Sequence, residues 1–395
     1  MPYAYPCLIF NALPYYLLFL VPAAIVYRIS SLRARPWVIV VSGAAFFLYF
    51  GYRLAGLPGA ACLLIFLWEA ILSRLYRHGS RWCIFGMAQS FMFLGIFKYW
   101  NFFTGLFGHA GAQLHWAGAF LPLGISFFTF EFYHFASDRR AGRSESGTLG
   151  EYLAFILFFP TLVAGPIKRF QEFAPQLREP LTDWNRDWER GWTRILTGLA
   201  KKFAVADLMT SLTMHLNAHD ILTADRRVLP IWLLAYGIKI YADFSGYSDI
   251  AIGSARLFGL RVQENFDWPY FRPNIRLFWR TWHMSLTCWL RDYLYIPLGG
   301  SRVPPMRIYA NIAVVMLFCG LWHGAGIHFV VWGLWHGLLL ISHRLWRRFR
   351  GEPSTHPAAV FLSGLLTFTL VNAGWAFFCM DLHTAMLFYR RLFFG

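Results

Sequence analysis

Polar and ionisable side chains inside long apolar stretches are the first candidates for chemistry, because such groups are costly to bury. Histidine is the most informative of them, since its imidazole gains or loses a proton near neutral pH and can act as a general base. Three segments of this chain of 395 residues carry candidate groups. They are YADFSGYSDIAIG at 241–253, which ends an apolar run, with Asp243, Ser245, Tyr247 and Asp249; the amphipathic RTWHMSLTCWLRD at 280–292, with His283; and CGLWHGAGIHF at 319–329, with His323.

His323 has the most suggestive surroundings of the three. It follows Arg307 by sixteen residues, which is about 24 Å of straight helix at 1.5 Å per residue. If Arg307 marks the cytoplasmic face, His323 lies beyond the middle of the bilayer. Gly320 and Gly324 flank it and leave room for another helix, a ligand or the tail of a substrate. A histidine in such a place suits activation of a hydroxyl group.

Each of these residues also has a purely structural interpretation. A histidine within a membrane can simply form hydrogen bonds between helices and have no catalytic role. The string LWHG occurs twice, so His336 competes with His323 for any catalytic role. Asp243 and Asp249 can simply tie helices together. Residue type and spacing therefore leave catalysis and packing both open.

The composition indicates that these residues are positioned by membrane helices. Hydrophobic residues make up 57% of the chain and charged residues 14%, against about 45–50% and about 25% in soluble domains. This leaves too little charge for a water-exposed surface, whereas lipid-facing surface is apolar. The net charge of +16 comes from Lys and Arg that lie between apolar runs. Positive-inside sorting explains that charge more simply than nucleic-acid binding, which we exclude.

The apolar runs predict an all-α, polytopic membrane protein. A transmembrane helix needs roughly 20 mostly apolar residues, and we expect about eleven spans in one domain that covers residues 1–395. The first run has no basic residue before it, so we expect a retained helix rather than a signal peptide. The uninterrupted runs lie at 8–27, 36–52, 57–73, 83–104, 119–136, 228–244, 308–322, 327–342 and 358–379, and interrupted ones at 151–166 and 190–217.

Two regions depart from simple spans. Pro160, Gly165 and Pro166 interrupt the run at 151–166, and backbone freed by proline at membrane depth must be repaired by protein or line a cavity. We therefore predict a re-entrant or broken helix there. Arginine clusters after several runs place the stretch 256–307, with its eight arginines, in the cytoplasm. Its amphipathic part predicts a platform at the membrane surface.

No metal site or disulfide framework is expected. The six cysteines, at positions 7, 62, 83, 288, 319 and 379, include no CxxC pair. Four of them lie within apolar runs, where cysteine usually acts as a small hydrophobic residue.

Several strings together resemble the membrane-bound O-acyltransferase family, and they occur in order over about residues 94–343. They resemble most closely the bacterial members that acylate cell-envelope polymers, in particular the alginate O-acetylase branch, with the teichoic acid D-alanyl transfer proteins as more distant relatives. The strings are LPLGISFFTFEFYHF (121–135), FFPTLVAGPIKRFQEF (158–173), IYADFSGYSDIAIGSARLFG (240–259), ENFDWPYF (264–271), FWRTWHMSLTCWLRDYLYIPLGGSR (278–302) and GLWHGAGIHFVVWGLWHG (320–337).

The resemblance implies specific roles for residues of this chain. The two functional histidines of the family correspond to His283 and His323, which favours His323 over His336. It also implies a central funnel through the helices, with the histidine at its narrowest point. Four further residues would bind substrate and shape the cytoplasmic entrance of that funnel: Asn265, Trp282, Arg291 and Asp292.

The predicted function is O-acyl transfer, with an acetyl group as the first choice. The donor would be a cytoplasmic thioester, either acetyl-coenzyme A or an acyl-carrier thioester, with no other cofactor. The acyl group would cross the bacterial inner membrane to a cell-envelope or exported polysaccharide, directly or through a periplasmic relay partner. D-alanyl transfer to a teichoic-acid-like polymer, a transporter with proton-relaying histidines and a non-catalytic scaffold are the alternatives.

Overall fold

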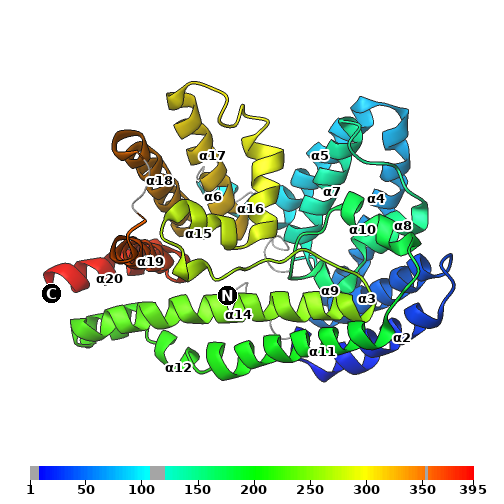
Figure 1. Cartoon of the computed structure of the whole chain (residues 1–395), viewed down its shortest axis with the longest axis horizontal. Coiled ribbons are helices and arrows are strands. Elements are labelled where there is room, and N and C mark those ends of the chain that lie inside the picture. The colour runs from blue at the N-terminus through cyan, green and yellow to red at the C-terminus, as the bar shows by residue number, and fades with distance from the viewer. Residues whose placement is uncertain (1–8, 107–120, 352–354) are drawn as a thin grey trace. The chain divides into compact units, whose positions relative to one another are not determined.

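The computed structural model describes residues 9–106, 121–351 and 355–395, and all regular structure in these ranges is helical (Figure 1). The chain forms two compact units. The described residues up to Leu199 form the first unit together with Gly246–Glu264, and Ala200–Ser245 and Asn265–Gly395 form the second. The helical fold class is confirmed, whereas the single domain over residues 1–395 stays a prediction.

The first unit contains the helices formed by the N-terminal apolar runs. A turn at Gly56 (φ 61°) separates two parts of α3, where the sequence predicted two separate runs. Helix α5 packs along α7 (Figure 1). The helices are α2 (Val21–Ile29), α3 (Arg35–Ala61), α4 (Leu63–Leu75), α5 (Ser80–Leu94), α6 (Trp100–Leu106), α7 (Ile125–Arg140), α8 (Leu149–Ile156), α9 (Phe159–Leu162), α10 (Phe170–Phe173) and α11 (Trp184–Ala200), of which all but the last residue lies in this unit.

The predicted break at 151–166 is confirmed. Helix α8 ends at Ile156, and Pro160 lies in the first turn of the four-residue helix α9. Gly165 then adopts φ 119°, a value that side chains rarely allow, and a Cβ there would lie 2.8 Å from the Cβ of Ala251. The chain therefore turns in a tightly packed interior instead of continuing as a helix.

A buried ion pair follows this break. Lys168 Nζ lies 2.5 Å from Glu131 Oε1 on α7, and both side chains are 2% exposed. The ammonium also lies 4.9 Å from the centre of the Phe155 ring. Neither charged residue was singled out in the sequence, because nothing in their spacing, 37 residues apart, predicts that they meet.

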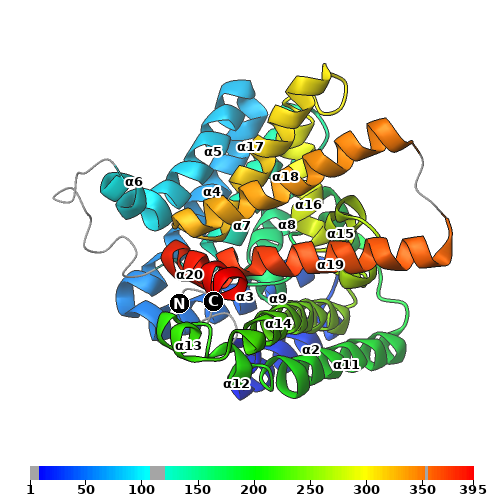
Figure 2. The ribbon, with the colours of Figure 1, turned by 90° about the vertical axis from the view of Figure 1, so that its left-hand side faces the viewer.

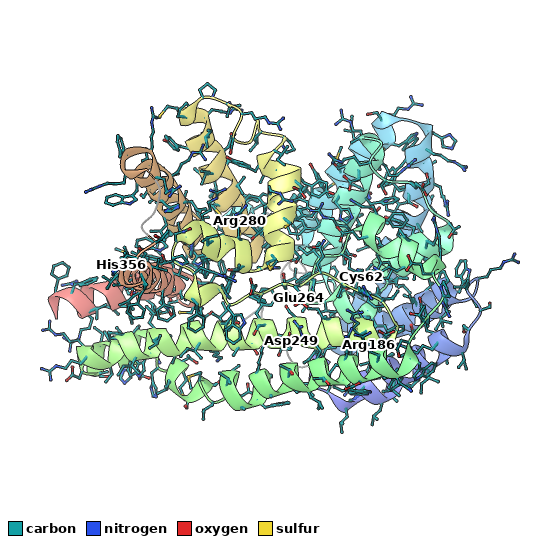
Figure 3. All side chains as sticks on the ribbon, in the orientation of Figure 1. Cys62, Arg186, Asp249, Glu264, Arg280 and His356 are labelled. Atoms are coloured by element: carbon teal, nitrogen blue, oxygen red, sulfur yellow. The ribbon has the colours of Figure 1, made fainter. Side chains whose placement is uncertain are left out.

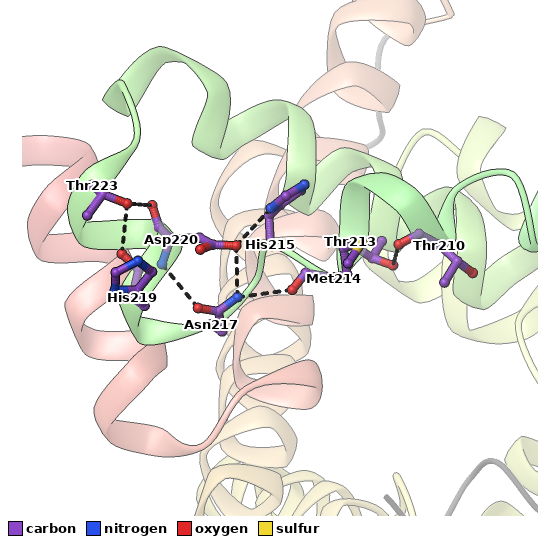
Figure 4. Close-up of polar contacts among 8 residues, drawn as sticks. All are labelled: Thr210, Thr213, Met214, His215, Asn217, His219, Asp220 and Thr223. Atoms are coloured by element: carbon purple, nitrogen blue, oxygen red, sulfur yellow. Dashed lines mark hydrogen bonds and ion pairs between the residues drawn. The ribbon is translucent and has the colours of Figure 1, made fainter.

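The interrupted run at 190–217 forms several short elements instead of one span. Helix α11 is followed by a π-helical turn (Lys201–Ala206), α12 (Thr210–Thr213) and α13 (Ala218–Thr223). Asn217 caps α13, because its Oδ1 accepts from the backbone N of Asp220 at 3.0 Å. His215 Nδ1 lies 2.7 Å from the same Asp220, through Oδ2 (Figure 4). These polar contacts keep the chain from continuing as an apolar helix.

The second unit contains the helices that carry the candidate site. Helix α14 contributes its first part to this unit and its last part to the first unit. Helices α17 and α18 pack closely on each other (Figure 2). The helices are α14 (Leu229–Leu257), α15 (Ile275–Thr281), α16 (Met284–Leu290), α17 (Pro305–His323), α18 (Ile327–Arg350), α19 (Pro357–Cys379) and α20 (Leu382–Phe394).

Four helices in the described residues are long and apolar enough to cross a bilayer: Arg35–Ala61, Arg226–Leu257, Pro305–His323 and Pro357–Cys379. Helix α19 exposes Phe361, Leu362, Leu365 and Leu366, each at least 51% accessible, as expected of a lipid-facing surface. The protein is therefore a multi-pass membrane protein. The prediction of about eleven spans stays a prediction, because turns and π-helical segments divide several of the runs.

Removal of one partner of the buried ion pair should lower the free energy of unfolding more than removal of both. Lys168→Met leaves the carboxylate of Glu131 buried without a cation and should lower the free energy of unfolding by about 3–5 kcal/mol. The double variant Glu131→Leu, Lys168→Met removes both charges and should recover most of that loss. Unfolding of the purified variants in detergent measures the difference. A double variant less stable than Lys168→Met would contradict this interpretation.

Candidate active site

His283 lies at a sharp turn between two short helices. Helix α15 ends at Thr281, α16 begins at Met284, and His283 between them has φ 44° and ψ 56°. This left-handed conformation costs a non-glycine residue about 1–2 kcal/mol. The surrounding structure must therefore hold the residue in place.

The segment after α14 holds this turn. The backbone N of Met284 donates to the carbonyl oxygen of Asn265 at 2.9 Å, and the backbone N of Asp267 donates to that of Thr281 at 3.0 Å. These two hydrogen bonds lie on either side of His283. The segment that contains Asn265 and Asp267 therefore holds the backbone in place before and after His283.

The side chain of Asn265 fixes the imidazole as well. Its Oδ1 lies 3.1 Å from His283 Nδ1, 3.2 Å from the backbone N of Ser285 and 2.9 Å from Ser285 Oγ. The backbone N of Ser285 can only donate, so the atom that faces it is an acceptor oxygen. His283 must then donate from Nδ1, which leaves Nε2 without a proton and with a free lone pair.

The remaining ring nitrogen of His283 is buried but has no partner. Nε2 makes no hydrogen bond within the described part of the chain, although the residue is only 1% exposed. Phe244 packs edge-on against the imidazole, with 4.6 Å between ring centres. Burial lowers the pKa of His283 to about 3, so the imidazole is neutral at physiological pH. The result is a fixed, uncharged hydrogen-bond acceptor.

His323 is the last residue of α17, as expected for a histidine near the end of a membrane helix. Its ring lies among aromatic rings, with centre distances of 4.9 Å to Trp322, 5.1 Å to Trp332 and 5.0 Å to Phe378. The Trp322 ring is also 6.0 Å from His283. Both predicted histidines therefore lie beside the ring of Trp322.

His336, from the second LWHG string, belongs to the same cluster. It is fully buried, and its ring lies 4.9 Å from that of Trp332. The side chains of both LWHG histidines therefore contact one tryptophan. The sequence presented His323 and His336 as competitors, but the structure places both against the ring of Trp332.

The other predicted site residues have different surroundings. Trp282 is 3% exposed, and its ring lies 5.7 Å from Tyr270 and 5.4 Å from Phe278. Arg291 Nε contacts Asp292 Oδ1 at 2.6 Å, and the Arg291 side chain is 58% exposed. Asn265 is fully buried and joins His283 directly, so its side chain is a support for that histidine.

The acidic residues of 241–253 form ion pairs between segments. Lys202 Nζ lies 3.0 Å from Asp243 Oδ1, within the second unit. In the first unit Arg194 bridges Asp249 on α14 and Glu264 on the segment that follows, at 2.6 and 2.5 Å (Figure 3 labels both carboxylates). These contacts agree with the structural interpretation of both aspartates.

The described residues contain no group of three His, Cys, Asp or Glu side chains that could hold a metal ion. The cysteines in those ranges are free thiols, and Cys7 lies outside them.

Comparison with known proteins agrees with the predicted resemblance. A family model described as MBOAT, membrane-bound O-acyltransferase family, matches residues 61–360. The chain belongs to this family. It therefore belongs to a family of membrane-bound acyltransferases, and the family resemblance expected from the sequence is confirmed.

Three relatives show how far the similarity extends. A protein named probable alginate O-acetylase, from Pseudomonas aeruginosa, is 37% identical over 80% of the chain, which spans only 61% of that relative. A peptidoglycan O-acetyltransferase from Helicobacter pylori is 32% identical over 89% of the chain and 72% of the relative. A teichoic acid D-alanyltransferase from Streptococcus thermophilus is 33% identical over 57% of each chain.

Replacement of Asn265 should strongly destabilise the folded protein, because one small side chain accepts three hydrogen bonds. Asn265→Leu leaves three donors without their acceptor, and each buried donor without a partner costs about 1–3 kcal/mol. Ser285→Ala removes one of those donors and should cost only about 1 kcal/mol. Thermal unfolding of purified protein should therefore rank Asn265→Leu well below Ser285→Ala and the wild type. Equal losses in the two variants would argue against the shared acceptor.

The low pKa of His283 predicts a pH dependence of stability. Above about pH 6.5 the imidazole is neutral in both the folded and the unfolded chain. Below that pH the unfolded chain binds a proton at His283, whereas the folded protein does not bind this proton until about pH 3. Stability should therefore fall by up to about 1.4 kcal/mol for each pH unit in this window.

His283→Asn isolates this effect, because asparagine tolerates the left-handed backbone and does not titrate. Between pH 7 and pH 5 the unfolding midpoint of the wild type should fall more steeply than that of the variant. Parallel curves would mean that His283 is not held neutral by folding.

Proposed function

We propose that this membrane-bound acyltransferase moves an acetyl group from a cytoplasmic thioester across the bacterial inner membrane, for O-acylation of a cell-envelope or exported polysaccharide. The observation that carries the proposal is that His283 and His323 both contact the ring of Trp322. One of the two has a fixed and unused lone pair. The O-acetylating relatives match more of the chain than the D-alanylating one, which supports acetyl as the group transferred.

His323 is proposed as the base. It takes the proton of the acceptor hydroxyl while that oxygen attacks the carbonyl carbon of the thioester. The new C–O bond forms, the carbonyl electrons move onto oxygen and return, and the C–S bond breaks. The thiolate leaves with the proton that His323 has received, so the imidazole ends neutral.

His283 is proposed to orient the thioester. Nε2 carries no proton in the tautomer that Asn265 imposes, so it cannot polarise a carbonyl oxygen by donating to it. It can accept a hydrogen bond from an N–H group. The pantetheine arm that coenzyme A shares with acyl-carrier proteins has an amide N–H two carbons from the sulfur, which is a suitable donor.

The remaining predicted features complete the proposal. Trp282, Arg291 and Asp292 shape the cytoplasmic entrance of the funnel. Arg291 extends into solvent and suits the phosphates of coenzyme A or an acidic acyl-carrier protein. A periplasmic partner would accept the acyl group or pass it on to the polymer.

D-alanyl transfer is the second candidate. It rests on the match to the teichoic acid D-alanyltransferase. The acid released from the product distinguishes the two, because acetate and D-alanine differ in mass and charge.

His323→Ala should abolish envelope acylation. Cells that produce the wild type, His323→Ala or no protein are compared for ester-linked acid in the envelope by mass spectrometry. Membrane insertion of the variant is checked in parallel. Ester should be present only with the wild type, because the hydroxyl otherwise loses its base. Normal ester content with His323→Ala would show that this histidine is not the base and would favour a scaffold role for the protein.

A further inference from the structure

A second set of polar atoms near His323 has no hydrogen-bond partner. Within the described residues, Trp279 Nε1, Trp332 Nε1 and both ring nitrogens of His336 are buried and make no hydrogen bond. The three side chains are 6%, 1% and 0% exposed. Most buried polar groups in proteins are satisfied, and each exception calls for an explanation.

These atoms belong to one cluster. The ring of Trp279 lies 5.9 Å from that of Trp332 and 5.2 Å from that of His336. The ring of Trp332 lies 4.9 Å from that of His336. It also stands edge-on to His323, 5.1 Å away, with an interplanar angle of 89°. Trp332 therefore connects the unsatisfied groups to the proposed base.

The cluster has more donors than acceptors. Each indole contributes one N–H and accepts nothing, and a neutral imidazole contributes one N–H and one lone pair. Three donors thus stand against one acceptor. Each donor left without a partner in the interior costs about 1–3 kcal/mol. A ligand oxygen with lone pairs would accept from these donors and offset this cost, whereas a ligand N–H group would not.

Trp375 shows that the same environment can satisfy an indole. Its ring stacks on Trp332 at 5.8 Å and is 1% exposed, yet its Nε1 donates to Tyr270 Oη at 3.1 Å. Tyr270 Oη in turn donates to the carbonyl oxygen of Gly237 at 2.7 Å. Burial in the aromatic cluster therefore does not by itself leave a tryptophan without an acceptor.

We propose that Trp279, Trp332 and His336 bind the carbonyl oxygen of the acyl group and stabilise it as an oxyanion while the acceptor hydroxyl attacks. This inference rests on the proposed function. As the oxygen of the hydroxyl bonds to the carbonyl carbon, the carbonyl π electrons move onto the oxygen held by the N–H groups. They return when the C–S bond breaks, and the proton passes through His323 to the thiolate. The cluster supplies the donors that the deprotonated Nε2 of His283 cannot.

Tryptophan-to-phenylalanine variants test the inference, because they keep an aromatic ring and delete the N–H group. Trp279→Phe and Trp332→Phe should each lower the initial rate of ester formation by about 10²–10³-fold, the usual cost of one oxyanion donor. Trp375→Phe is the matched control. It makes the same change in a ring that stacks on Trp332, but it deletes an N–H that already has a partner. It should form ester at close to the wild-type rate.

Thermal unfolding provides the second readout. Trp375→Phe should lower the unfolding midpoint most, because it leaves Tyr270 without its donor, whereas Trp279→Phe and Trp332→Phe delete donors that folding leaves unsatisfied. A structural role for all three would instead make rate and stability fall together. Full rates with Trp279→Phe and Trp332→Phe, beside an active wild type, would overturn this inference alone. A wild type without ester would overturn the proposed function.

Discussion

The acceptor oxygen of Asn265 is the contact on which the rest of the site depends. It receives three donors, and the backbone of the same residue holds the turn at His283. A left-handed histidine persists only where its surroundings outweigh the cost of the conformation. By fixing both the backbone and the tautomer, this one amide decides that the second ring nitrogen of His283 is an acceptor. The chemistry open to His283 follows from that choice.

The unpartnered acceptor of His283 and the unpartnered donors of the Trp279, Trp332 and His336 side chains are a set of groups that suits a thioester. Nε2 of His283 is a lone pair without a donor, whereas Trp279, Trp332 and His336 are richer in donors than in acceptors. Both sets are buried among aromatic rings. In such an environment electrostatic interactions are stronger than in water, and an unmade hydrogen bond is more costly. A ligand with one N–H and one carbonyl oxygen would satisfy both sets at once.

The sequence predicted the features that depend on hydropathy and local backbone chemistry. These include the helical fold, the break at Pro160 and the location of His323 near a helix end. The sequence did not predict features that join distant segments. Asn265 was expected at an entrance, but it reaches His283 across 18 residues of chain, and no periodicity encodes that contact. The pairing of Lys168 with Glu131 was missed for the same reason.

The glycine that precedes each LWHG string has a structural explanation in the approach of two helices. Helices α17 and α18 cross where Gly320 faces Gly333, and a Cβ on Gly320 would lie 2.2 Å from the carbonyl oxygen of Phe329. Only glycine allows this approach. It brings the end of α17, with His323, against the face of α18 that carries Trp332 and His336. Gly320 and Gly333 are therefore as necessary to the arrangement as the histidines, because without them Trp332 on α18 could not lie beside His323, the proposed base, on α17.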